Sequence, residues 1–238
     1  MAAAIDGPRL NAKSGVAKQL VIFLHGYGAD GNDLIEVGRQ WRPLLPDADF
    51  VAPHAPERCA MSPTGRQWFP LTMRDPDERW RGVVAARPML NAFIDAELEK
   101  RGLDERALAL VGFSQGTMMA LHTGLRRKRP VRTILGYSGV LVTGPEQAGE
   151  ELPAHLARPD QRPAILLVHG DRDPLIPVEA LFLSIDIIGE AGLAAQWHMS
   201  PGLEHGIDNA GLLHGGLFLA QSFGVAVDFK TRAAAPAR

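Results

Sequence analysis

The sequence predicts an α/β fold: a mostly parallel central sheet with helices on both faces. Short runs rich in Val, Ile, Leu and Phe alternate along the chain with longer segments of helical periodicity, and such runs are typical of parallel strands buried on both sides. With 238 residues, 46% hydrophobic and 22% charged, the chain has the length and composition of one large globular domain. We therefore expect a single domain over residues 1–238, with residues 1–18 and 230–238 peripheral or frayed.

Strands and helices are expected in alternation. The apolar runs predict strands at Gln19–Leu24, Asp49–Ala52, Ala107–Gly112, Arg132–Tyr137, Ala164–His169 and Ala194–Met199. Helical patterns lie at Asp33–Arg42, Val84–Arg101, Gln115–Arg127, Val178–Ala191 and Ile207–Phe223. Because helices separate most consecutive strands, the strands can run parallel in a doubly wound sheet.

Local signals support individual helices. Asp30 stands just before the first helix, where it favours turn formation and helix capping. The second helix, Val84–Arg101, carries apolar residues on one face of its later half, and Pro88 must either kink it or mark its first turn. The basic run Arg126–Arg129 is expected at the C-terminal end of the third helix, before Pro130, because positive side chains are stabilised by the negative end of a helix dipole.

Composition excludes several functional classes. The formal net charge of −2 gives no attraction to nucleic acid or to an acidic membrane surface. A single cysteine, Cys59, excludes an internal disulfide and a Cys-rich zinc site and favours a reducing compartment. The first residues lack the apolar core of a signal peptide, and no apolar run reaches membrane-spanning length. We expect a cytoplasmic protein without an integral membrane segment; a homodimer is left open.

A candidate nucleophile lies in the sequence GFSQG, residues 112–116, between a predicted strand and a predicted helix. This context is the one that the nucleophile elbow GxSxG requires. Ser114 would occupy a sharp, strained turn in which the flanking glycines remove colliding side chains. Its hydroxyl would lie at the start of a helix, where the positive end of the dipole and free N–H groups stabilise an oxyanion. The alternative is an ordinary turn with Ser114 as a helix N-cap.

An acid and a base follow in the order that this architecture uses, Ser, then Asp, then His. Asp171 and Asp173 lie in the loop after a predicted strand, and the spacing leaves open which one is the acid. His205 lies in a glycine-flanked loop after the last predicted strand. Loops beyond the carboxyl ends of parallel strands are where such sheets assemble sites. Most other histidines are interpreted as structural or exposed, with His169 as a hydrogen-bonded support.

The glycine-rich stretch HGYGADG, residues 25–31, follows the first predicted strand. It formally fits GxGxxG, so a non-catalytic nucleotide-binding module is the alternative from another functional class. That module needs an acidic residue at the end of the second strand, whereas Asp49 stands at its beginning. In a hydrolase the same loop would complete an oxyanion hole, and the backbone N–H groups of Tyr27 and Gln115 are the two expected donors.

The long connection from Pro53 to Arg79 carries apolar residues that we expect to form an acyl pocket beside the serine. The alternative is that they only attach the loop to the core. These substrate-binding candidates are Met61, Trp68, Phe69 and Leu71.

The chain resembles the carboxylesterase, phospholipase and acyl-protein thioesterase family of α/β-hydrolases, especially its bacterial members. The segments that carry the resemblance are FLHGYGADGNDLI, GRQWF, GFSQG, HGDRDPLIP and GLEHGI. The resemblance runs from about Leu20 to Phe223. It implies an α/β-hydrolase fold without a large lid domain, with Ser114 as nucleophile, His205 as base and Asp173 as acid. It also implies that Tyr27 and Gln115 donate the oxyanion-hole hydrogen bonds.

The resemblance further implies that no metal or organic cofactor is needed. The implied substrates are carboxylic esters, including short acyl esters and lysophospholipids, and in some branches protein-bound thioesters. The thioesterase branch typically continues its WF with aspartate, whereas this chain has Pro70 and Leu71. This departure argues against a specific assignment as an acyl-protein thioesterase. We therefore expect a serine hydrolase of small esters or lipids.

Overall fold

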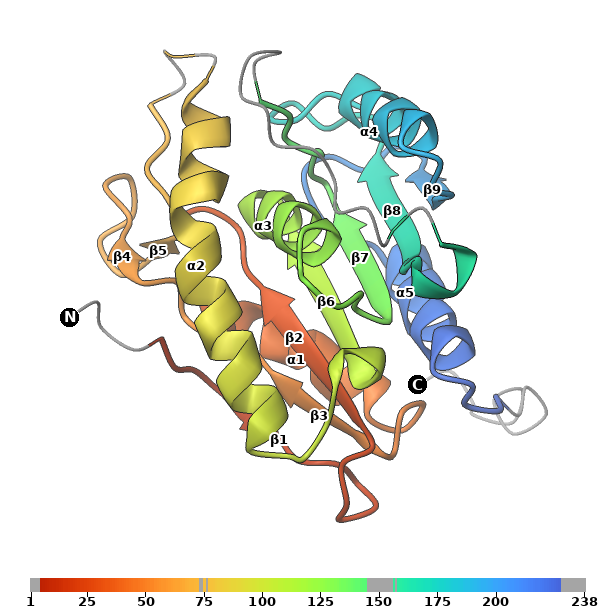
Figure 1. Cartoon of the computed structure of the whole chain (residues 1–238). Helices are drawn as coiled ribbons and strands as arrows, with labels where there is room; N and C mark the ends of the chain where they lie inside the picture. The colour runs from red at the N-terminus through yellow and green to blue at the C-terminus, as the bar shows by residue number, and fades with distance from the viewer. Residues whose placement is uncertain (1–4, 73–74, 76, 145–155, 157, 228–238) are drawn as a thin grey trace, which may run out of the picture.

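A computed structural model describes residues 5–72, 75, 77–144, 156 and 158–227 (Figure 1). Its centre is a seven-stranded sheet of order β1-β3-β2-β6-β7-β8-β9, in which β1 is antiparallel to β3 and the other neighbours are parallel. A separate antiparallel hairpin pairs β4 with β5. The strands are β1 (Arg9–Leu10), β2 (Gln19–Leu24), β3 (Ala48–Val51), β4 (Glu57–Arg58), β5 (Arg66–Gln67), β6 (Leu108–Phe113), β7 (Thr133–Tyr137), β8 (Ala164–Gly170) and β9 (Gln196–Ser200).

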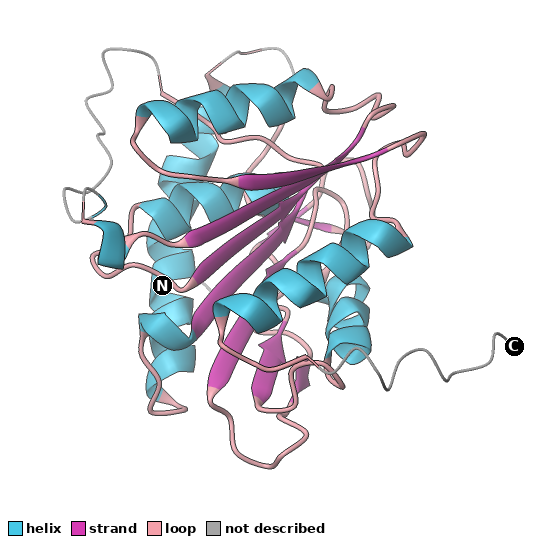
Figure 2. Cartoon of the chain, turned by 90° about the vertical axis from the view of Figure 1, so that its right-hand side faces the viewer, coloured by secondary structure: helices cyan, strands magenta, loops and turns pink. Residues whose placement is uncertain are grey.

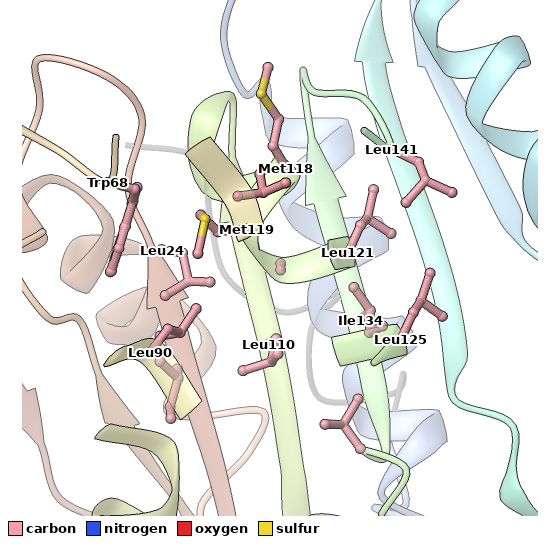
Figure 3. Packing of buried hydrophobic residues seen from close by; sticks show 14 of the residues in the cluster. Leu24, Trp68, Leu90, Leu110, Met118, Met119, Leu121, Leu125, Ile134 and Leu141 are labelled. Atoms are coloured by element: carbon pink, nitrogen blue, oxygen red, sulfur yellow. The ribbon is translucent and has the colours of Figure 1, made fainter. Parts of the chain in front are cut away.

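Helices lie on both faces of the sheet, as Figure 2 shows. They are α1 (Gly31–Trp41), α2 (Glu78–Glu99), α3 (Gln115–Leu125), α4 (Glu179–Glu190) and α5 (Asn209–Ser222). The alternation of strand side chains produces two cores. On one face, Leu20, Ile22 and Leu24 of β2 belong to a cluster with residues of α2, α3 and α4 (Figure 3). On the other, Val21 and Phe23 pack with residues of α1 and α5.

The predicted α/β fold is confirmed, and most element ends differ from the predicted ones by one or two residues. The second helix is the main exception, because it begins at Glu78 rather than Val84. Pro88 therefore lies inside the helix, and the first-turn alternative is wrong. Pro88 is exposed, so water can satisfy the carbonyl that loses its N–H partner.

Residues 1–18 were expected to be peripheral or frayed; in the structure residues 5–12 lie at the sheet edge but are attached to it rather than frayed, and most of residues 13–18 are exposed. Strand β1 pairs with β3, and Ile5 itself is buried. The Arg9 guanidinium donates to Glu97 of α2 at 2.7 Å, and the Ala12 amide donates to Asp49 at 2.7 Å. A two-residue strand has no periodicity to detect, which is why the sequence pattern missed it. Residues 230–238 lie outside the described residues.

The carboxyl ends of β2, β6, β7, β8 and β9 meet at one edge of the sheet (Figure 1). The loops after β2, β6, β8 and β9 carry the predicted catalytic and oxyanion-hole residues, as is general for open parallel sheets. Of the helices in the described ranges, none has the length and hydropathy to cross a membrane.

Candidate active site

Ser114 occupies a strained turn between β6 and α3. Its backbone angles are φ 54° and ψ −117°, and a positive φ is unfavourable for a residue with a Cβ. The Ser114 amide donates to Tyr137 O at 2.9 Å, and Ser114 O accepts from the Thr117 amide at 2.9 Å. These bonds and the packed strand and helix hold the serine in a conformation that it would not otherwise adopt.

The two glycines beside this serine allow close backbone approach. A Cβ on Gly116 would lie 1.7 Å from Leu24 O of β2, and a Cβ on Gly112 would lie 2.3 Å from Gly116 O. Any side chain at either position would therefore push α3 away from β2 or β6. The glycines are required by the packing of the helix on the sheet as well as by the sharp turn.

Asp173 and His205 form a short hydrogen bond across two loops. The His205 Nδ1–H donates to Asp173 Oδ2 at 2.6 Å, and Asp173 Oδ1 accepts from the Leu175 and Ile176 amides at 2.9 Å each. Burial alone would raise the pKa of Asp173, but the hydrogen bonds from Ile176, His205 and Leu175 outweigh it, so the pKa is lowered. Asp173 is therefore a charged, fully enclosed acceptor that fixes the imidazole.

The structure distinguishes the two candidate aspartates. Asp171 is exposed and accepts from the Gly202 amide at 2.5 Å, which links the acid loop to the loop of His205. Asp173 is the one that contacts the imidazole. His169 is buried, donates from Nε2 to Ile176 O at 2.8 Å, and lies 3.4 Å from Asp173 Oδ2. It supports the acid loop, as the sequence predicted.

The loop of His205 is held against the serine turn. The His205 ring packs on the Phe113 ring, with 5.0 Å between the centroids, and Phe113 directly precedes Ser114. Ser138 at the end of β7 donates to Gly206 O at 3.0 Å. Within the described part of the chain, neither Ser114 Oγ nor His205 Nε2 has a hydrogen-bond partner. A bond between these two atoms is often long before substrate binds.

The loop after β2 lies beside Ser114. A Cβ on Gly26 would be only 3.3 Å from the Ser114 Cβ. The backbone N–H groups of Tyr27 and Gln115 find no acceptor among the residues that the structure describes. Arg66 of the β4–β5 hairpin supports this loop, because its carbonyl accepts from the Gly28 amide and its amide donates to Ala29 O. The two free N–H donors, Tyr27 and Gln115, thus lie just beyond the ends of the neighbouring strands β2 and β6.

The same loop argues against a nucleotide-binding module. The Asp30 side chain accepts from the Asn32 amide at 2.7 Å and completes a capping box with Asp33 at the start of α1. Two carboxylates therefore stand at the helix N-terminus, where a pyrophosphate would have to bind.

The predicted pocket residues divide into two groups. Trp68 and Phe69 are 1% and 2% exposed and contribute to the wall of a cavity of about 690 Å³ between α2 and the loops around the β4–β5 hairpin. Met61 is 82% exposed, Leu71 packs on the core, and the wall of this cavity includes neither. Contact of any of these four residues with a substrate stays a prediction.

Sequence reasoning missed His25 and the side chain of Gln115, which are both 1% exposed beside the free donors. The His25 ring accepts from the Ala55 amide through Nε2 at 2.9 Å and donates from Nδ1 to Gly26 O at 2.8 Å. Burial lowers the pKa of His25 and keeps the ring neutral. His25 itself was the sequence signal, because a polar ring at the end of an apolar strand needs hydrogen-bond partners when it is buried.

The chain is similar to proteins that are named as esterases and thioesterases. Residues 6–221 match the model of a family described as phospholipase/carboxylesterase. The chain is 28% identical to "Esterase YpfH" of Escherichia coli over 81% of this chain and 78% of that protein. It is 29% identical to "Acyl-protein thioesterase 1" of Gibberella zeae over 78% and 82% of the two chains. The crystal structure of esterase PE8 superposes with a TM-score of 0.82 at 40% identity, covering 92% of this chain and 99% of that one.

Proposed function

The chain belongs to the phospholipase/carboxylesterase family of α/β-hydrolases, and from this premise we propose that it is a serine esterase whose nucleophile is Ser114. Family membership supplies the reaction class, the hydrolysis of an ester or thioester. The assignment of the catalytic residues is supported chiefly by one observation. Asp173 and His205 form a 2.6 Å hydrogen bond, and the His205 ring packs on Phe113, the residue before the strained Ser114.

The proposed mechanism uses an acyl-enzyme intermediate. Ser114 Oγ attacks the carbonyl carbon of the ester while His205 Nε2 takes the hydroxyl proton. The tetrahedral oxyanion accepts hydrogen bonds from the free N–H groups of Tyr27 and Gln115, which strengthen as charge develops. His205 then gives its proton to the leaving alcohol, and a water molecule repeats the sequence on the acyl-enzyme. Asp173 holds the imidazole in the required tautomer and stabilises its charged form.

Covalent labelling tests this assignment directly. We expect a fluorophosphonate probe to modify Ser114 of the folded protein, because only an activated serine reacts readily with it. Peptide mass mapping would locate the modification. A probe bound elsewhere, or no labelling of a folded sample, would refute the serine mechanism.

The activity should rise with pH as the general base becomes neutral. The base must be unprotonated to accept the serine proton, so kcat/KM is expected to increase as the pH is raised from about 5 to about 8. Asp173 adds no second ionisation to this pH range, because its pKa is lowered and its carboxylate is already charged. Burial lowers the pKa of His25 as well, and its Nε2 accepts from the Ala55 amide, so both its burial and its hydrogen bonding favour the neutral ring. A flat profile measured with a neutral ester would contradict a histidine base.

We further propose that the substrate is a carboxylic ester or lysophospholipid whose acyl group enters the cavity beside Phe69. Protein-bound thioesters are the alternative, because a similar protein carries the name acyl-protein thioesterase. A matched panel of esters and thioesters that differ only in acyl length distinguishes these substrates. Higher kcat/KM for thioesters at every length would overturn the preference for esters.

A bulky side chain in this cavity should select against long acyl groups. Ala85 is exposed and lines the cavity from α2, so Ala85→Phe is expected to reduce kcat/KM for an octanoate ester about tenfold relative to an acetate ester. Ala92→Phe places the same bulk on an exposed position of α2 outside the cavity and is the control. An unchanged octanoate-to-acetate ratio in Ala85→Phe would show that acyl groups bind elsewhere.

A further inference from the structure

Trp68 makes hydrogen bonds to both of the segments that carry the free N–H donors. Its indole N–H donates to His25 O, two residues before Tyr27, at 2.9 Å. Its backbone N–H donates to the side-chain oxygen of Gln115 at 2.9 Å. The indole ring also packs on the His25 imidazole, with centroids 5.5 Å apart. Figure 3 shows the ring near the carboxyl end of β2, above Leu24 and beside Met119.

Gln115 completes this connection from the other side. Its side-chain NH₂ group donates to Phe69 O at 2.7 Å while its oxygen accepts from the Trp68 amide. The Gln115 side chain is thus bound at both ends to residues 68 and 69, and its own backbone N–H remains free. With Trp68 and Gln115 each 1% exposed, breaking one bond leaves a buried polar group without a partner.

The sheet alone does not fix the two donors relative to each other. The last paired residues of β2 and β6 are Leu24 and Gly112, and both donors lie three residues beyond them. An oxyanion hole needs both N–H groups within about 3 Å of one oxygen. Direct packing of Gly26 on Ser114 and of Gly116 on Leu24 brings the two segments together. Among the described residues, Trp68 adds hydrogen bonds to both of them.

We propose that Trp68 is a positioning residue that sets the geometry of the oxyanion hole, in addition to any part it takes in the acyl pocket. This inference rests on the proposed function, in which Tyr27 and Gln115 stabilise the oxyanion. It predicts a defect in transition-state stabilisation that does not depend on the acyl chain. A pocket residue would instead change the preference among acyl lengths.

The test is the variant Trp68→Phe, which removes the indole N–H and keeps an apolar ring. We expect kcat to fall about tenfold, less than the 10²–10³ loss for a missing oxyanion donor, with KM unchanged and the octanoate-to-acetate ratio of kcat/KM unchanged. Affinity for a trifluoromethyl ketone, which forms a hemiketal oxyanion with the serine, should weaken by the same factor as kcat/KM. Binding of the corresponding unreactive ether should stay constant.

Two further variants keep the inference testable. Gln115→Met removes the side-chain bonds to residues 68 and 69 but retains the backbone N–H, and it should show the same kinetic signature even if Trp68→Phe folds poorly. The two substitutions should be strongly non-additive, because they break one network. Trp80→Phe is the control, since Trp80 packs on His122 and Arg126 away from the donors.

The outcomes separate this inference from the proposed function. Unchanged kcat in Trp68→Phe and Gln115→Met, with Ser114 still labelled by the fluorophosphonate, overturns the positioning role alone. A loss confined to the octanoate ester, or a lower Tm with normal kcat, also overturns it. Failure of the wild-type protein to label at Ser114 overturns the proposed function instead.

Discussion

Substitution of Ser114 with alanine is expected to lower kcat for ester hydrolysis by about a million-fold, the scale found when a serine hydrolase loses its nucleophile. The loss is this large because His205 and Asp173 have no other group to activate once the hydroxyl is absent. The measurement is single-turnover and steady-state hydrolysis by purified protein. Ser14→Ala, at an exposed serine in the loop before β2, is the matched control and should retain full activity. Near-normal hydrolysis by Ser114→Ala would reject the mechanism.

The strained backbone of Ser114 adds a second readout to this experiment. Glycine tolerates a positive φ, whereas alanine retains the unfavourable contact of a Cβ at φ 54°. Ser114→Gly should therefore be as inactive as Ser114→Ala and more stable than it by about 1 kcal/mol. Urea unfolding of the two variants measures the difference. Equal or reversed stabilities would mean that the elbow stores no strain.

The variant Asp173→Asn is expected to lower kcat about ten-thousand-fold. The asparagine oxygen would keep the hydrogen bonds from the Leu175 and Ile176 amides, which now reach Oδ1. Its NH₂ group would then face His205 Nδ1 and donate to it. That donation requires an unprotonated Nδ1, so the proton moves to Nε2 and the ring can no longer accept the proton of the serine.

Asp171→Asn is the matched control for this substitution. Asp171 lies in the same loop, but it is exposed and caps the Gly202 amide rather than the imidazole. We expect its kcat to remain within about a factor of a few of wild type, because changes to exposed groups are usually small. A larger loss in Asp171→Asn than in Asp173→Asn would reverse the assignment of the acid.

Stability should also depend on pH through Asp173. Its pKa in the folded protein is lowered, so its contribution is present at neutral pH. That contribution is lost as the pH falls below the usual aspartate range towards the folded pKa. Asp173→Asn removes this dependence. Denaturant unfolding of wild type and variant between about pH 2 and 6 should give stability curves that converge at the acid end; parallel curves would contradict the linkage.

Several features of the fold and the site were predictable because they follow from local chemistry. The alternation of Leu20, Val21, Ile22 and Phe23 between two faces is set by strand geometry, and it fixes which side chains enter which core. The glycines at 112 and 116 were predicted to avoid collisions at a sharp turn, and a Cβ at either position would indeed lie within 2.3 Å of a backbone oxygen. The two-residue strands β1, β4 and β5 are too short to show a periodic pattern, so the sequence did not predict them.

The sequence by itself determined the α/β fold and the chain order of the proposed nucleophile, acid loop and base loop, because strand periodicity and loop position are local properties. Loop spacing left Asp171 and Asp173 open and only the resemblance implied Asp173, whereas the tertiary structure shows that the folded loops bury Asp173 against His205 and leave Asp171 exposed. Only the tertiary structure decided the partners of Trp68, because His25 and Gln115 lie far away in the chain. Burial and hydrogen-bond partners arise when distant segments meet, and no local pattern encodes them.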